Sequence, residues 1–286
     1  MPPLIHNIQK LILERLHAFP DARFVTDTQL VLDPGTGTLM NIETLLGMLE
    51  EVAEPYHHEV IDQFVGALTR SITELPAEVD TLDRREVLGS VTRLIYPEDV
   101  LPGVQNPQPL APGLVTAWAL AREDTLAVMP PEKLIAHAAE EDMDRAARAR
   151  VRAYARGLTV VRELGGVLLH GGRQTTSVAL YIDDCARAVK LPRCAHGYFV
   201  SVPDRTHCII VPATKIASLL PMMEVTVGTF LNSAQQFSPF VYHWINGTWH
   251  ALVTDAGVTP TPELLALHGP VDLWDQDEDY WDGDAA

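Results

Sequence analysis

Histidines beside glycine turns and acids are the clearest candidates for chemistry in this chain. His170 follows an apolar run and precedes Gly171-Gly172, the kind of loop that forms the oxyanion hole of esterases. Such enzymes also carry their nucleophile in a Gly-x-Ser-x-Gly pentapeptide, which the chain does not contain. A triad of His170, Ser177 and Asp183 is compatible with a hairpin, but so are many other choices. The glycine pair therefore predicts a turn between two strands.

A second group of polar side chains lies around residues 202–208. Arg205 and His207 are on or next to a predicted tight turn, and functional groups concentrate in turns that a rigid scaffold positions. Together with His170 and Asp183, they form one candidate catalytic set. One hypothesis is therefore a hydrolase, or another enzyme, with a site at the interface of the two halves of the chain, near His170 and His207.

The thiols and nearby imidazoles raise the question of a metal site. The group consists of Cys185, Cys194, His196, His207 and Cys208. Zinc ligands usually come in pairs about two to four residues apart, and Cys194-Ala-His196 is too tight for the usual knuckle. Adjacent His207 and Cys208 point to opposite faces of a strand. Buried cysteine acting as a small apolar residue explains the positions better, so we predict no metal and no other cofactor.

Arginines recur at spacings of three and four residues along a predicted helix. These are Arg145, Arg148, Arg152 and Arg156, and acids precede them, so the charge order matches the helix dipole. We favour ion pairs within the helix, such as Asp144 with Arg148, because weak surface pairs are common. The alternative is a basic stripe that binds an anion, a partner or the protein's own acidic tail.

The segment 271–286 combines seven acids with three aromatic residues and no base. Exposed aromatic side chains often anchor a protein partner. With no catalytic motif and an acidic body, the leading hypothesis is a non-enzymatic adaptor or regulator that acts through protein–protein contacts, with a basic protein as a candidate partner. The candidate contact residues are Trp274, Tyr280, Trp281, Arg145, Arg148 and Arg152.

Charge and hydropathy narrow the environment of the protein. A formal net charge of −17 argues against nucleic-acid binding and against docking on anionic membranes. No apolar run approaches the roughly 18 residues of a membrane span, and the start lacks the layout of a signal peptide. Three cysteines form an odd set, as in proteins with reduced thiols. We therefore expect a cytoplasmic protein. A homo-oligomer joined through exposed sheet edges is a third hypothesis.

Two predicted hairpins set the fold class. Residues 198–211 and 240–253 both read as strand, turn and strand, and Asn246-Gly247 favours a type I′ turn. An apolar helix is predicted between them, over residues 216–231. The pattern is typical of an α+β fold, with antiparallel sheets built from hairpins, helices packed on one face, and two similar-sized halves.

The rest of the chain shows a similar order of elements. Helices are predicted at residues 4–16, 59–73, 83–95 and 131–156. Strands are predicted at residues 23–32, 113–120, 125–129, 158–169 and 177–182, and Asp183 or Asp184 is expected to cap a short helix. Prolines in residues 100–112 indicate a linker. The predicted parts are an N-terminal half (1–100), a C-terminal domain (113–270) and the acidic aromatic tail (271–286).

Several short motifs occur in a recognisable order: Pro109-Leu-Ala-Pro-Gly-Leu114, the arginine-rich helix, the hairpin from Val202 to Pro212, and Ser238-Pro-Phe-Val-Tyr242. This order resembles the YtpQ-like family of uncharacterised bacterial proteins. The resemblance implies strands and helices in both halves and a bacterial cytosolic protein, and it implies no activity. The family often places an acid after the arginine of the hairpin, where this chain has Thr206.

Overall fold

The computed structural model describes residues 3–25, 27–33, 38–50, 52–69, 79–98, 107–121, 126–172, 174–233 and 235–269. Packing divides the chain into two compact units. Unit 1 comprises Met1–Arg93, Asp99–Pro107 and Ala117–Ala147, and unit 2 comprises Leu94–Glu98, Gln108–Thr116 and Arg148–Ala286. Residues 117–147 thus pack with the N-terminal part. The division into an N-terminal half (1–100) and a C-terminal domain (113–270) stays a prediction.

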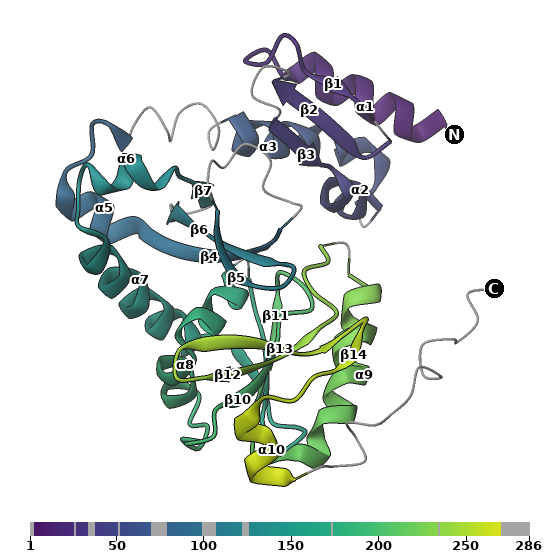
Figure 1. Cartoon of the computed structure of the whole chain (residues 1–286). Coiled ribbons are helices and arrows are strands. Elements are labelled where there is room, and N and C mark those ends of the chain that lie inside the picture. The colour runs from purple at the N-terminus through teal and green to yellow at the C-terminus, as the bar shows by residue number, and fades with distance from the viewer. Residues whose placement is uncertain are drawn as a thin grey trace. The chain divides into compact units, whose positions relative to one another are not determined.

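The fold is α+β with antiparallel sheets, as the sequence predicts. Unit 1 begins with α1 (Pro3–Arg15), whose apolar face packs beside a three-stranded sheet (Figure 1). The sheet has the order β1-β2-β3. Its strands and the helices that follow are β1 (Arg23–Phe24), β2 (Gln29–Asp33), β3 (Thr38–Asn41), α2 (Glu43–Glu50) and α3 (His57–Thr69). Ile12, Leu30 and Ile61 are fully buried in the core of this unit, so the helices bury the apolar stripe that their sequences carry.

The predicted helix over residues 83–95 is wrong in its second half. Helix α5 spans Arg84–Ser90, where Asp83 and Glu86 form a reciprocal capping box. Residues Val91–Pro97 form strand β4 instead. This segment contains Val, Thr, Ile and Tyr, which favour a pleated, buried surface over a helix.

A four-stranded antiparallel sheet follows, with the order β4-β6-β5 and β7 paired to β6. Strand β6 (Leu114–Ala121) is buried over most of its length and pairs with β7 (Leu126–Val128), as predicted. Strand β5 (Gln108–Ala111) lies within the predicted linker, so that part of the prediction is wrong. Its Pro109 is in a register irregularity, where a missing N–H is tolerated.

The helix predicted over residues 131–156 is two helices, α6 (Pro131–Ile135) and α7 (Glu140–Ala155). The N–H of His137 bonds the carbonyl of Leu134, which tightens and ends the first helix. Three acids, from Glu140 to Asp142, then occupy the first turn of α7 and stabilise a new N-terminus.

Unit 2 is built on a seven-stranded antiparallel sheet with the order β14-β13-β12-β10-β11-β9-β8. Its strands are β8 (Thr159–Val161), β9 (Val167–His170), β10 (Tyr198–Ser201), β11 (His207–Pro212), β12 (Val241–Ile245), β13 (Thr248–Thr254) and β14 (Gly257–Val258). Both hairpins predicted from the sequence, over residues 198–211 and 240–253, are confirmed. Asn246 and Gly247 have φ values of 51° and 83°, as a type I′ turn requires.

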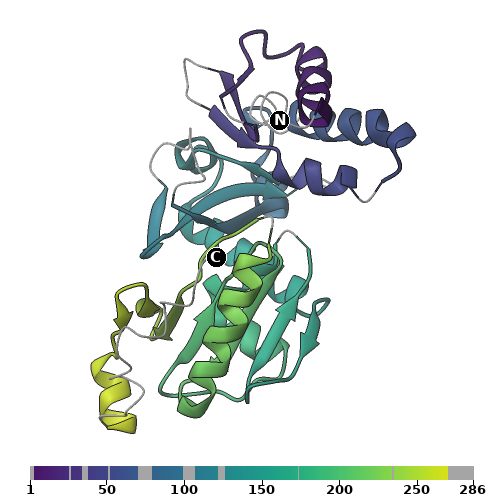
Figure 2. The same cartoon turned by 90° about the vertical axis from the view of Figure 1, so that its right-hand side faces the viewer.

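Helices cover this sheet. Helix α9 (Leu219–Leu231) packs its Leu219 and Met222 against Phe199 and Val211 of the sheet (Figure 2). Helix α8 (Ile182–Ala188) covers the opposite face. Cys208 of β11 is fully buried, and burial, with a smaller effect of Cys185 on α8, raises the pKa of its thiol. Figure 1 shows α8 and α9 on opposite sides of the strands.

The strand predicted over residues 177–182 is wrong. Residues Thr175–Tyr181 form a buried 3-10 helix, η3, that leads into α8. Neither Asp183 nor Asp184 caps α8, because Tyr181 is at the N-cap and makes no side-chain cap. The strand predicted over residues 158–169 is also wrong, because the segment forms two strands, β8 and β9, which pair as a hairpin. Gly171 and Gly172 therefore do not form the predicted turn between two strands but lie between β9 and η3. Helix α10 (Pro262–His268) closes the unit and ends at Gly269, whose φ is 69°.

Candidate functional site

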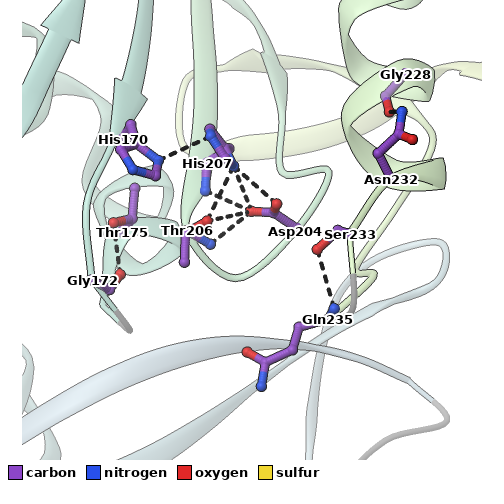
Figure 3. A network of polar contacts seen from close by, with 10 residues as sticks. All are labelled: His170, Gly172, Thr175, Asp204, Thr206, His207, Gly228, Asn232, Ser233 and Gln235. Atoms are coloured by element: carbon purple, nitrogen blue, oxygen red, sulfur yellow. Dashed lines mark hydrogen bonds and ion pairs between the residues drawn. The ribbon is translucent and has the colours of Figure 1, made fainter. Parts of the chain in front are cut away.

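Strand pairing brings His170 and His207 together at one end of the sheet in unit 2. The register of β9 against β11 places the two residues directly opposite each other. Their rings lie with centroids 4.5 Å apart, and the Nδ1 atom of His170 is 2.9 Å from the Nε2 atom of His207 (Figure 3). A hydrogen bond therefore joins the exposed imidazole of His170 to the half-buried imidazole of His207.

A buried carboxylate lies behind the histidine pair. Asp204, which is 5% exposed, accepts hydrogen bonds from the backbone N–H groups of Thr206 and His207 at 2.7 and 2.8 Å. The Thr206 hydroxyl is 3.1 Å away, and the Nδ1 atom of His207 is 2.9 Å from both carboxylate oxygens. An aspartate at the start of a tight loop commonly forms such a turn, because its carboxylate can accept the backbone N–H two residues later. Asp204 thus fixes both the turn and the ring of His207.

The hydrogen bonds assign the protons of this group. An ionised Asp204 only accepts, so His207 carries its proton on Nδ1 and presents a lone pair at Nε2 when neutral. A neutral His170 must then donate from its Nδ1 atom, which leaves the Nε2 atom of this exposed side chain without a proton. The arrangement Asp204–His207–His170 is a chain in which each group orients the next. We call these three residues the imidazole relay.

The loop that holds Asp204 is fixed by a second chain segment. Residue Asp204 forms an isolated β-bridge with Gln236, and the N–H of Phe237 bonds the carbonyl of Pro203. Ser238 is buried next in sequence, with its hydroxyl 2.7 Å from that of Tyr242. Burial raises the pKa of the Tyr242 hydroxyl, which stays neutral as a hydrogen-bonding support. The loop that carries Asp204 is therefore joined by backbone hydrogen bonds to the segment that leads into β12.

The structure brings together some of the predicted catalytic residues. His170 and His207 are in contact, and Arg205 lies in the same turn, between Asp204 and Thr206. Asp183 lies on α8 instead, where it lines a cavity with Arg187 and Tyr198. Ser177 is buried in η3, and its hydroxyl has no partner among the described residues. The hypothetical triad of His170, Ser177 and Asp183 depended on a strand over residues 177–182. The structure has the 3-10 helix η3 there, so the hairpin that the triad required does not form.

Asp204 was missed by the sequence reasoning. An acid three residues before a histidine in a predicted turn is a usable signal, because an aspartate at a turn start accepts the N–H groups that follow it. That signal identifies a turn, however, and the partner of His207 across the sheet becomes visible only with the strand register.

Three arginines of the stripe, Arg145, Arg148 and Arg152, lie on α7 and pair with two different carboxylates, whereas Arg156 lies just beyond the end of the helix. Arg145 pairs with Asp142, three residues earlier on the same helix. Arg148 and Arg152 instead reach Asp184 on α8, which Arg187 also contacts. The three arginines around Asp184 form an arginine cluster within unit 2.

The cysteines are free thiols in different environments. Cys185 and Cys208 are buried, and Cys194 is partly exposed. Burial, with a smaller effect of Asp184, raises the pKa of the Cys185 thiol to about 12, and burial raises the pKa of the Cys208 thiol as well. No three histidine, cysteine, aspartate or glutamate side chains of the described residues come together as ligands of a metal ion would.

The tail anchors Trp274, Tyr280 and Trp281 lie outside the described residues. Over the part of the chain that the structure describes, no helix combines the length and the apolar character that crossing a membrane requires. No protein-family model, curated protein or solved structure matches the chain. The membership in a YtpQ-like family that the motifs suggest stays a prediction.

Proposed function

We propose that the protein is an acid–base enzyme, with hydrolysis as the reaction class and His170 as the group that exchanges protons with the substrate. One observation carries this proposal: a buried carboxylate orients one imidazole, and that imidazole orients a second, exposed one. Orienting partners of this kind hold a general base in one tautomer. A histidine also changes protonation near neutral pH, which suits it to proton transfer.

The proposed chemistry follows from the proton assignment. The Nε2 atom of His170 accepts a proton from a water molecule as the water oxygen bonds to the electrophilic atom of the substrate. The resulting positive charge on His170 is stabilised through its Nδ1–H bond to His207, which is itself held by the negative Asp204. The proton then passes from His170 to the leaving group as the bond to that group breaks.

The test that needs no known substrate uses diethyl pyrocarbonate, which acylates an unprotonated imidazole nitrogen. We expect His170 to be acylated several-fold faster than the exposed His17, and Asp204→Asn to slow the reaction at His170, with peptide mass spectrometry as the readout. An equal rate at His170 in the parent and in Asp204→Asn would remove the physical basis of the proposal.

Activity is tested with p-nitrophenyl acetate and p-nitrophenyl phosphate. General base catalysis contributes about 10²–10⁴-fold, so His170→Gln should lower turnover by at least about 100-fold. His17→Gln is the matched control, since it removes an exposed imidazole that belongs to unit 1 and is not part of the relay. Equal turnover by the parent and by folded His170→Gln would show that the relay is not catalytic.

The adaptor hypothesis remains a second proposal for the tail. It rests on the composition of residues 271–286, seven acids and three aromatic residues, and not on contacts. Replacing Trp274, Tyr280 and Trp281 with alanine should abolish capture of a defined partner while leaving the melting temperature unchanged. Capture that survives these three changes would rule out the tail as the contact surface.

A further inference from the structure

Three arginines converge on one buried aspartate in unit 2. Arg152 lies 2.7 Å and Arg148 3.4 Å from the carboxylate oxygens of Asp184, and Arg187 bonds the same carboxylate. Asp184 is 2% exposed, whereas the arginine side chains are between 44% and 72% exposed. The carboxylate is thus enclosed by guanidinium groups whose other sides face solvent.

Charge is left over after these ion pairs form. Three guanidinium groups carry three positive charges against the single negative charge of Asp184. A guanidinium has five N–H donors, and a carboxylate can accept only about four hydrogen bonds, so most donors of the cluster remain for other acceptors. A positive site is uncommon on a protein with a net charge of −17, and mere solubility does not require it.

The donors are held in place before any ligand arrives. Asp184 anchors one edge of each guanidinium, and Arg148 also lies over the ring of Tyr181 at 5.4 Å from its centroid. The Nε–H of Arg187 donates to the carbonyl of Asp183 at 3.2 Å. Groups fixed in this way lose little side-chain entropy when they bind a further anion.

A cavity adjoins the cluster through Arg187. Its volume is about 200 Å³, and it is lined by Asp183, Ala186, Arg187, Leu191, Arg193 and Tyr198. Drug-sized ligands occupy pockets of roughly 300–1,000 Å³, so this cavity suits a smaller group. Taken together, the cluster and cavity hold four arginines and two aspartates, which leaves two positive charges.

We propose that the arginine cluster and the adjoining cavity bind a small molecule that carries a phosphate group. A phosphate dianion matches the two surplus charges, and its oxygens accept the paired N–H groups that guanidinium presents. The arginines of the cluster contact the phosphate, while Ala186, Leu191 and Tyr198 contact the organic part of the molecule. This inference is independent of the imidazole relay, since it uses none of its residues.

Calorimetric titration of the full chain tests the proposal, with inorganic phosphate, phenyl phosphate and acetate at constant ionic strength. We expect saturable binding of both phosphates, tighter binding of phenyl phosphate because its ring enters the cavity, and much weaker binding of acetate. Acetate binding as tight as that of phosphate would overturn the proposal, because it would show unspecific attraction of anions.

Substitutions locate the site. Arg152→Gln and Arg187→Gln should each weaken phosphate binding about tenfold, the effect of losing one charge-assisted hydrogen bond. The matched control is Arg156→Gln, an exposed arginine beyond the end of α7. Equal affinities of Arg152→Gln and Arg156→Gln would overturn the assignment.

A further variant tests the cavity without removing an ion pair of Asp184, so that weaker binding cannot be attributed to unfolding of the cluster. Arg193 lines the cavity but is not among the arginines that contact Asp184. Arg193→Gln therefore leaves the cluster intact and should reduce the affinity for phenyl phosphate. If Arg193→Gln bound phenyl phosphate as tightly as the parent, the cavity would not be part of the site.

Discussion

His243 shows how the surroundings of one residue set its proton chemistry. The side chain is fully buried, with Nδ1 2.9 Å from the Thr261 hydroxyl and Nε2 2.8 Å from the carbonyl of His196. Thr261 also caps α10 by accepting the N–H of Leu264, so its hydroxyl proton is directed to His243. Burial lowers the pKa of the His243 imidazole, chiefly by desolvation of the charged ring.

This lowered pKa predicts a loss of stability in mild acid. His243 binds a proton less readily in the folded state than in the unfolded state, where the pKa of a histidine is about 6.5. The contribution of His243 is therefore complete above about pH 6.5 and declines as the pH falls toward the folded pKa. We expect the free energy of unfolding, measured in urea at pH 7.5 and 5.5, to fall less in His243→Gln than in the parent. The control His17→Gln should behave as the parent, and a parental slope in His243→Gln would contradict the assignment.

The thiols give a second prediction at this scale. Because burial raises the pKa of the Cys185 and Cys208 thiols, neither offers a reactive thiolate in the folded protein at pH 8. Cys194 is partly exposed. Iodoacetamide should therefore modify Cys194 in the native protein and all three cysteines in guanidinium chloride, as read by intact and peptide mass. Labelling of Cys208 in the folded chain at the rate of Cys194 would contradict the burial.

At the scale of elements, the β12–β13 hairpin and α9 use glycine in opposite ways. Gly247 has a φ of 83° in the hairpin turn, with open space where a Cβ would lie. Gly228 lies in α9, where a Cβ would also meet open space but the backbone is that of an ordinary helix. Steric clashes are absent at both sites, so backbone preference alone decides the effect of a substitution.

We expect opposite changes in stability from the same substitution. Gly247→Ala should lower the free energy of unfolding by about 1 kcal/mol, because an L-residue resists the left-handed conformation. Gly228→Ala should raise it by roughly 0.5–1 kcal/mol, because alanine loses less entropy in a helix. Urea denaturation of the two variants and the parent measures both values. Changes of the same sign would show that the backbone does not adopt these conformations in solution.

At the scale of the whole molecule, the net charge and the short edge strands of the seven-stranded sheet both disfavour self-association. The edge strands of the seven-stranded sheet are β14, with two residues, and β8, with three. Short edges offer few unpaired backbone groups to a second copy. The net charge of −17 adds repulsion between copies at pH 7. The homo-oligomer joined through sheet edges stays an untested hypothesis, and this sheet gives it little support.

We therefore expect a monomer at pH 7 in 0.15 M salt, measured by sedimentation velocity. Association should increase toward the sequence pI of about 4.9, where repulsion between copies vanishes. Circular dichroism at each pH separates association from unfolding. A stable dimer at pH 7 that persists on dilution would contradict the expectation.

The sequence by itself determined the elements whose signals are local. Hairpin β12–β13 follows from Asn246-Gly247 between alternating residues, and α1 and α9 follow from apolar spacing, because each pattern needs only neighbouring residues. The same local reasoning extended a helix over β4, although the Val, Thr, Ile and Tyr of that segment favour a strand, and it predicted a strand over η3, where burial within the fold decides the conformation.

Only the tertiary structure decided the two sites. His170 and His207 meet because β9 pairs with β11 in one register, although 37 residues separate them in the chain. Asp184 pairs with arginines of α7 because α7 lies beside α8, although Arg152 is 32 residues away in the chain. Contacts of this range depend on which elements pack together, and that choice is made by the burial of the whole core and not by any local pattern.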